Sequence, residues 1–301
     1  MMKQAVSVSI GHSKRDKKVV IDLLGEKVSL ERIGTDGNMN KAAELFRELD
    51  GKVDAFGIGG ADLGLQVDKK YYPLHSVKPM IRYIRKTPFV DGLGLKTTLE
   101  RRTAAFLEQH IGSEIIWKRV LFTSGADRWG LAMGFVNAGW KCVFGDLMFG
   151  LGIPLPIFTI DRVKTIASFV IPIVSRVPFK MLYPTGEKQE INEPKFEKWY
   201  NWASVIAGDC HFVKHHMPEN MKGKIVVTNT TTPEDVEFFR ERGVKYMITT
   251  TPCLDGRSFG TNMMEAALVD VSGKKRPLTL TELNQLIDEL HLEPQIHRLN
   301  D

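Results

Sequence analysis

Short runs of apolar, β-branched residues alternate with helix-like segments along most of this chain. Apolar runs predict strands at residues 5–10, 53–60, 119–123, 141–144, 205–207, 224–228 and 244–250. Apolar residues spaced near a period of 3.6 predict helices at residues 40–49, 75–86, 99–109, 131–138, 261–269 and 279–290. This alternation of strand and helix is typical of an α/β protein with parallel sheets.

The same pattern suggests where the chain divides. Residues 112–117 separate a first α/β unit from a second, which opens with a strand, a tight turn, a helix and another strand from residue 119 onward. We therefore expect an N-terminal α/β domain at residues 1–115 and a Rossmann-like doubly wound domain at residues 116–272. A last helix lies in residues 273–301.

Composition narrows the class of protein. The 301 residues are 43% hydrophobic and 26% charged, which excludes a disordered chain. The three cysteines are odd in number and far apart, so neither a zinc ribbon nor a disulfide framework is predicted. The N-terminus has no signal-peptide pattern, and the most apolar stretch, residues 166–182, is interrupted by prolines and basic residues. We expect a cytoplasmic protein without a membrane partner.

The turn at residues 124–130 (SGADRWG) is the sharpest candidate for a binding site. It follows an apolar strand and opens a helix, as does the three-glycine turn that binds pyrophosphate in dinucleotide folds. Gly125 and Gly130 occupy the first and third glycine positions, Asp127 stands at the second, and Arg128 can offset its charge. Asp146, about 20 residues on, fits the acid that binds ribose and favours NAD over NADP. An unliganded turn with Asp127 as a helix cap is the alternative.

Polar residues at other strand ends are further candidates, because α/β enzymes bind ligands at that edge of the sheet. Lys96 could exchange a proton with a substrate hydroxyl if its pKa is lowered, and Asp91 could orient it. Thr228 and Thr250 offer hydroxyl groups to a cofactor. A helix N-terminus explains residues 91–102 equally well, and strand-end turns explain the threonines.

Two basic features remain. Arg257 could clamp a substrate carboxylate with its planar fork. The spacing of His211, His215 and His216 suits metal ligands, but no acidic ligand accompanies them, so we predict no metal and leave their role open. The net charge of +5 favours a small anionic ligand, and no basic helix or aromatic–basic stripe suggests nucleic acid.

The chain resembles the bacterial quinate 5-dehydrogenase group. The matching stretches are residues 32–37 (RIGTDG), 91–102, 127–130 (DRWG), 145–156, 183–189 and 249–267. More distantly it is similar to the shikimate and quinate dehydrogenases, although their Ser-x-Ser and Gly-Gly-x-Gly-Gly patterns are not found. That resemblance implies that the domain at residues 1–115 binds the substrate and the domain at residues 116–272 the nucleotide. It further implies a C-terminal helix at residues 273–301 that packs back on the first domain. It also implies Lys96 and Asp91 as the catalytic pair, and Asn262 beside the substrate.

These residues together predict an oxidoreductase that moves a hydride between NAD, or NADP, and the hydroxyl of a polyhydroxy carbocyclic acid. Two alternatives stay open. One is a non-catalytic module that binds a nucleotide or small ligand on the same fold. The other is a transferase that uses S-adenosylmethionine, which has no pyrophosphate for Asp127 to repel. The sequence also allows for a homodimer.

Overall fold

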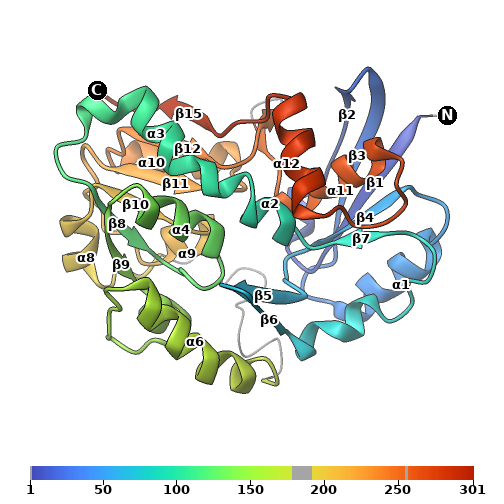
Figure 1. The fold of residues 1–301 in the computed structure, drawn as a ribbon, viewed down its shortest axis with the longest axis horizontal. Coiled ribbons are helices and arrows are strands. Elements are labelled where there is room, and N and C mark those ends of the chain that lie inside the picture. Colours follow the sequence, from blue (N-terminus) through green and yellow to red (C-terminus); the bar gives the residue numbers. More distant parts are fainter. Residues whose placement is uncertain (1, 178–191, 255–256) are drawn as a thin grey trace.

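The chain folds into two α/β lobes, each built on one large sheet with helices on both faces (Figure 1). This computed structural model describes residues 2–177, 192–254 and 257–301. The predicted α/β class with two domains is confirmed. Within the described ranges, no helix is long and apolar enough to cross a membrane.

The first lobe contains a five-stranded sheet in the order β2-β3-β1-β4-β7. Strands β3, β1, β4 and β7 are parallel, and β2 is antiparallel to β3. The strands are β1 (Lys3–Ser9), β2 (Lys17–Leu23), β3 (Glu26–Gly34), β4 (Ala55–Gly59) and β7 (Phe89–Val90), beside a hairpin of β5 (Gly64–Val67) and β6 (Lys70–Pro73). The helical segments are η1 (Ser13–Arg15), α1 (Met39–Leu49), η2 (His75–Ile81), α2 (Leu93–Thr97) and η3 (Glu100–Arg102).

The second lobe contains a six-stranded sheet in the order β15-β12-β11-β10-β8-β9. Its strands are β8 (Arg119–Phe122), β9 (Lys141–Phe144), β10 (Val205–Ala207), β11 (Ile225–Thr228), β12 (Tyr246–Thr249) and the antiparallel β15 (Gln295–Arg298). Its helices are α3 (Thr103–Ile111), η4 (Gly112–Glu114), α4 (Trp129–Asn137), α5 (Asp146–Leu151), α6 (Ile160–Val174), α8 (Glu197–Trp202), α9 (Cys210–His215) and α10 (Pro233–Glu241). The Rossmann-like description is not confirmed, because the five parallel strands run in the order 2-1-3-4-5 and not 3-2-1-4-5-6.

The C-terminal part of the chain crosses between the lobes more than once. After β13 (Cys253–Leu254) and β14 (Arg257–Ser258), α11 (Thr261–Ser272) returns to the first lobe. There it packs against β1 and β4, and it is buried on all sides from Met263 to Val271. Helix α12 (Leu280–Glu289) packs beside α2, and β15 then pairs with β12 of the second sheet. The ranges we predicted differ here: they place α11 in the second domain and all of residues 273–301 against the first.

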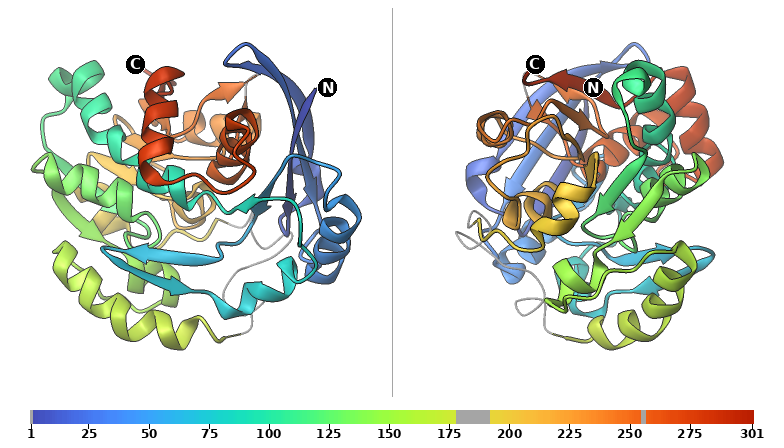
Figure 2. Two further views of the ribbon diagram at one scale, coloured as in Figure 1. Left: turned by 45° about the vertical axis from the view of Figure 1, so that its right-hand side comes forward. Right: turned by 90° about the vertical axis from the view of Figure 1, so that its left-hand side faces the viewer.

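Helix α6 bridges the two lobes along the bottom of the molecule in Figures 1 and 2. Val163 near its start packs into the core of the second lobe. Ala167 and Ile171, one and two turns later on the same face, pack into the core of the first lobe. Lys164 also pairs with Asp68 on the β5–β6 hairpin at 2.5 Å. The helix therefore fixes one side of the gap between the sheets.

Most predicted strands and helices are confirmed, and the exceptions have local causes. The helix expected at residues 75–86 is the 3-10 segment η2, which contains Pro79, a residue without an N–H to donate. The hairpin β5–β6 and the strand β15 were not predicted, because segments such as KYYP in β6 and QIHR in β15 contain no apolar, β-branched run.

A close approach between α4 and α2 makes the fold sensitive to one glycine. A Cβ at Gly130 would stand 2.0 Å from the carbonyl oxygen of Lys96 and 2.9 Å from the Cα of Thr97. Both are backbone atoms, so Gly130→Ala must push the helices apart. We expect a loss of about 1–3 kcal/mol in the free energy of unfolding, measured by urea denaturation.

Gly150→Ala is the matched control, because nothing lies within 4 Å of a Cβ at Gly150 in helix α5. It should leave stability unchanged or raise it slightly, since alanine favours helix over glycine. Equal stability of the two variants would contradict the packing role of Gly130.

Candidate functional site

A cavity of about 400 Å³ lies between the lobes, where the parallel strands of both sheets end. Its walls include Ser9 at the end of β1, Asp62 after β4, Ser124 after β8, Asp209 after β10 and Asn229 after β11. Open α/β sheets bind ligands at this edge, and here two such edges face one another. The volume is in the range of small-molecule sites.

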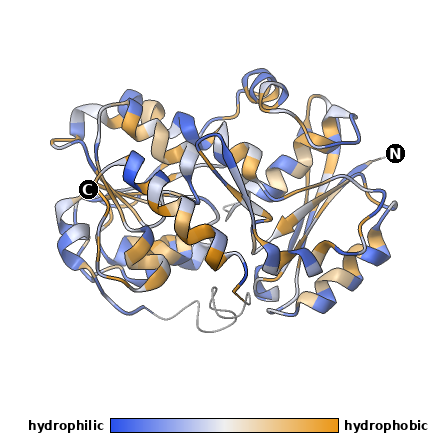
Figure 3. Ribbon diagram, turned by 60° about the horizontal axis from the view of Figure 1, so that its bottom comes forward, coloured by the Kyte–Doolittle hydropathy of each residue, from blue (hydrophilic) through white to orange (hydrophobic). Residues whose placement is uncertain are grey.

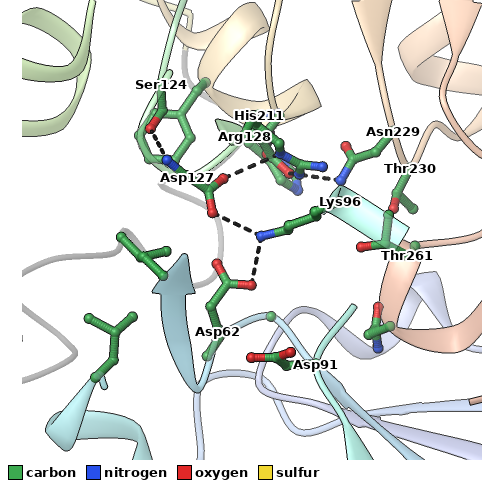
Figure 4. Close-up of a pocket in the computed structure, with 18 of the residues that line it drawn as sticks. Asp62, Asp91, Lys96, Ser124, Asp127, Arg128, His211, Asn229, Thr230 and Thr261 are labelled. Atoms are coloured by element: carbon green, nitrogen blue, oxygen red, sulfur yellow. Dashed lines mark hydrogen bonds and ion pairs between the residues drawn. The ribbon is translucent and has the colours of Figure 1, made fainter. Parts of the chain in front are cut away.

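An ion-pair network crosses this cavity, as Figure 4 shows. Lys96 of α2 donates to Asp62 of the first lobe at 2.7 Å and to Asp127 of the second lobe at 2.8 Å. The lysine is buried, and both of its partners are mostly buried. One ammonium group thus joins carboxylates from two separate lobes.

Arg128 extends the network into the second lobe. It pairs with Glu100 at 2.5 Å and with Asp209 at 3.4 Å, and only 4% of its side chain is exposed. Glu100 is fully buried and also accepts from the hydroxyl of Thr250 at 3.1 Å. The amide of Asn229 donates to Asp209 at 3.3 Å. Arg128 of the turn and Lys96 of α2 are therefore each held between acidic side chains.

The pKa values of the network follow from burial and from the neighbouring charges. Burial raises the pKa of Asp62 to about 7, against the attraction of Lys96 and with the repulsion of Asp127. Burial opposes the charged form of Lys96, but the attraction of Asp127 and Asp62 outweighs it and raises the pKa of the lysine. Burial acts against ionised Asp127 as well, yet Lys96 and Arg128 lower its pKa. Lys96 is therefore a fixed cation, and Asp62 is the group poised to titrate.

In the turn that we predicted to bind pyrophosphate, two backbone N–H groups already donate to a side chain of the protein. The backbone N–H groups of Gly125 and Ala126 donate to the carboxylate of Asp146, at 3.0 and 2.7 Å. Asp146 therefore closes the turn instead of extending toward a ribose. A Cβ at Gly125 would lie 2.6 Å from Phe144, so this glycine serves packing.

The other predicted residues are spread around the cavity. Asp91 lines it but accepts from the backbone N–H groups of Leu63 and Leu93, so it does not orient Lys96. Asn262 also lines it, and its amide donates to Ser7 at 2.7 Å. Thr228 is buried at the end of β11. The side chain of Arg257 and the loop at residues 183–189 lie outside the described part of the chain.

The histidines do not gather into a metal site. His211 and His215 line the cavity, whereas His216 packs against Phe149 and Phe196. Burial lowers the pKa of His211 below its usual value. Among the described residues, no three His, Cys, Asp or Glu side chains are grouped to hold a metal ion.

Three residues of the network were missing from the predicted site: Asp62, Glu100 and Asp209. Asp62 follows the glycine-rich end of β4, and Asp209 follows Gly208 at the end of β10. An acid directly after a buried strand was the available sequence signal for both. Glu100 had no such signal, because it looks like an ordinary helix-start residue.

Two family models match the chain. Residues 94–299 match the model described as Domain of unknown function (DUF8754). The chain belongs to this family. Residues 4–91 match the model described as Domain of unknown function (DUF8753). No curated protein matches the chain.

Several solved structures share a distant likeness with this DUF8754 chain. GanP, a glucose-galactose binding protein from Geobacillus stearothermophilus, is 10% identical with a TM-score of 0.37, over 99% of this chain and 98% of its own. A Mycobacterium smegmatis protein in complex with beta-D-fucofuranose is 12% identical with a TM-score of 0.35, over 98% and 99% of the two chains. A galactofuranose binding protein is 11% identical with a TM-score of 0.34, over 98% and 94%.

The expected quinate 5-dehydrogenase is wrong. Neither family model that matches the chain describes a dehydrogenase. Two features of the site also argue against an NAD-dependent oxidoreductase. Asp146 accepts from the backbone N–H groups of the turn. The pKa of Lys96 is raised, whereas proton transfer by this residue requires a lowered pKa. The NAD prediction came from the turn at residues 124–130 and from Asp146, and it stays a prediction. Neither alternative gains support as a nucleotide or S-adenosylmethionine site, since both relied on the same turn.

The buried pair of Arg128 and Glu100 gives a stability test. Arg128→Met leaves a fully buried carboxylate without its cation, which we expect to cost about 3–5 kcal/mol in urea unfolding. Adding Glu100→Gln removes the stranded charge, so the double variant should recover much of that loss. A double variant less stable than Arg128→Met would contradict this account.

Glu265 of α11 gives a pH test. It accepts from the backbone N–H of Leu95, and burial together with Asp91 raises its pKa to about 8. The folded protein therefore holds this proton more tightly than the unfolded chain, whose Glu titrates near 4.5. The contribution of Glu265 to stability is full below about pH 4.5 and is lost as the pH rises to about 8.

Glu265→Gln should lose less stability than the native protein between pH 5 and pH 9. The difference should be on the order of a few kcal/mol, measured by urea unfolding at each pH. Parallel pH profiles for the two proteins would show that Glu265 titrates normally in the folded state.

Proposed function

We propose that this protein is a non-catalytic binding protein for a small, uncharged, polyhydroxylated molecule held between its lobes. The observation that carries this proposal is the network of Asp62, Lys96, Asp127 and Arg128 at the meeting edges of the two sheets. The family descriptions state no function, so the proposal rests on the geometry and charge of the site.

Charge balance argues for an uncharged ligand. Lys96 faces two carboxylates, and Arg128 faces Glu100, Asp127 and Asp209. An anionic ligand would compete with these carboxylates for both cations. It would also leave buried acids unpaired, which is costly. The anionic ligand expected from the net charge is therefore not the one we propose.

The cavity also offers both kinds of hydrogen-bonding group. Carboxylates accept from hydroxyl groups, and ammonium and guanidinium groups donate to them. Two buried atoms of cavity-lining residues, Oδ1 of Asn229 and Oγ1 of Thr123, have no hydrogen-bond partner in the described structure. A hydroxyl group can donate and accept at once, so a polyhydroxylated molecule matches such a mixed wall.

A panel of neutral monosaccharides, alditols and cyclitols tests the proposal by thermal shift and isothermal titration. At least one compound should bind and raise the melting temperature, because a ligand that binds only the folded state stabilises it. Asp62→Asn should weaken that compound roughly 10- to 100-fold, through the loss of a hydrogen bond to a charged group. Asp288→Asn, an exposed carboxylate on α12, is the matched control and should not change affinity.

Three results would contradict the proposal. The first is that no compound of the panel binds at millimolar concentration. The second is that a sugar acid or sugar phosphate binds far more tightly than its neutral parent. The third is that Asp62→Asn and Asp288→Asn have equal effects on affinity.

A further inference from the structure

One half of the cavity is apolar and has no role in the binding of hydroxyl groups. Its walls come from α6, from the β5–β6 region with η2, and from the segment around α5. The lining residues there include Leu65, Leu74, Leu147, Ile166, Val170 and Val174. The cavity therefore has a polar end at the sheet edges and an apolar end along α6.

Helix α6 presents two apolar stripes with different surroundings. Val163, Ala167 and Ile171 recur every four residues and are buried in the cores of the lobes. Ile166, Val170 and Val174 recur in the same way on an adjacent stripe, line the cavity and are only partly buried. In Figure 3, where the bottom of the molecule faces the viewer, the C-terminal half of α6 is predominantly hydrophobic. Both stripes line the cavity, and Ile166 also packs against the core of the second lobe. Val170 and Val174 are the residues of the second stripe whose partly exposed apolar surface is directed to the cavity.

The polar and apolar ends of the cavity are lined by residues of the same chain segments. Asp62 of the network lies three residues before Leu65 of the apolar wall. Asp146 is followed directly by Leu147, and Ala126 lines the cavity beside Asp127. The network and the apolar residues line the same cavity, so a molecule that contacts the network can also contact apolar side chains.

We infer that the ligand is amphipathic: a hydroxylated head contacts the ion-pair network, and an apolar group of the same molecule lies along Ile166, Val170 and Val174 of α6. This inference rests on the proposed function for the head, and it adds the chemical class of the rest of the ligand. Burial of apolar surface is the driving force, since each buried methylene group tightens binding roughly fourfold.

A series of n-alkyl β-D-glucosides, from methyl to octyl and below their micelle concentrations, tests the inference by isothermal titration. Affinity should rise by roughly two- to fourfold per methylene until the apolar end is filled. Val170→Gln places an amide in the apolar wall and should reduce the affinity for octyl glucoside at least fivefold, while methyl glucoside changes little.

Phe169→Gln is the matched control on the same helix, because Phe169 faces outward with 72% of its surface exposed. It should leave the affinity for every glucoside unchanged. Equal losses in the two variants would show that alkyl chains bind the outer surface, which overturns the inference. An affinity independent of chain length, or no binding at any chain length, overturns it as well.

Asp62→Asn separates this inference from the proposed function. If octyl glucoside binding depends on Val170 but not on Asp62, the apolar end is real and the proposed hydroxyl site is wrong. If methyl glucoside binding depends on Asp62 and lengthening the chain adds nothing, the hydroxyl site stands and the apolar inference fails.

Discussion

The arrangement of the site depends on the two ion pairs made by the ammonium group of Lys96. Its two partners, Asp62 and Asp127, belong to different lobes and come from loops after β4 and β8. Buried ion pairs add little net stability, because desolvation of the charges offsets their attraction, but removal of one partner is costly. We therefore regard the network as a device that fixes the relative position of the two sheet edges, rather than as a large contribution to folding.

The sequence indicated which residues lie at the ends of the strands, but not which of them form ion pairs with one another. Several of the polar residues that follow buried strands line the cavity between the lobes, and so do Lys96, Asp127 and Arg128. That a ligand binds there stays a prediction. Their partners come from distant segments, and no local pattern reports such contacts. The turn at residues 124–130 was misinterpreted for a related reason. Its backbone N–H groups donate to Asp146, which follows the next strand. The spacing alone had assigned Asp146 to a ribose.

Helix α6 shows a second limit of sequence periodicity. Its apolar residues cover more than one face, and such a pattern alone does not separate a core stripe from a cavity wall. Both Ala167 and Val170 line the cavity, and only the packing shows that Ala167 is buried in the core of the first lobe while Val170 stays partly exposed. Because α6 contributes Val163 to the core of the second lobe and Ala167 to the core of the first, it also links the two lobes.

The late return of α11 has a consequence for how this protein is made. The core of the first lobe contains Met263, Leu268 and their neighbours, although its strands lie within the first 90 residues. During synthesis, the N-terminal sheet therefore leaves the ribosome with one face uncovered, and it stays so until helix α11, which ends at Ser272, has emerged. Exposed sheet surface of this kind is prone to aggregation. Dependence on chaperones during translation, and poor yield of any N-terminal fragment, follow directly from the path of the chain.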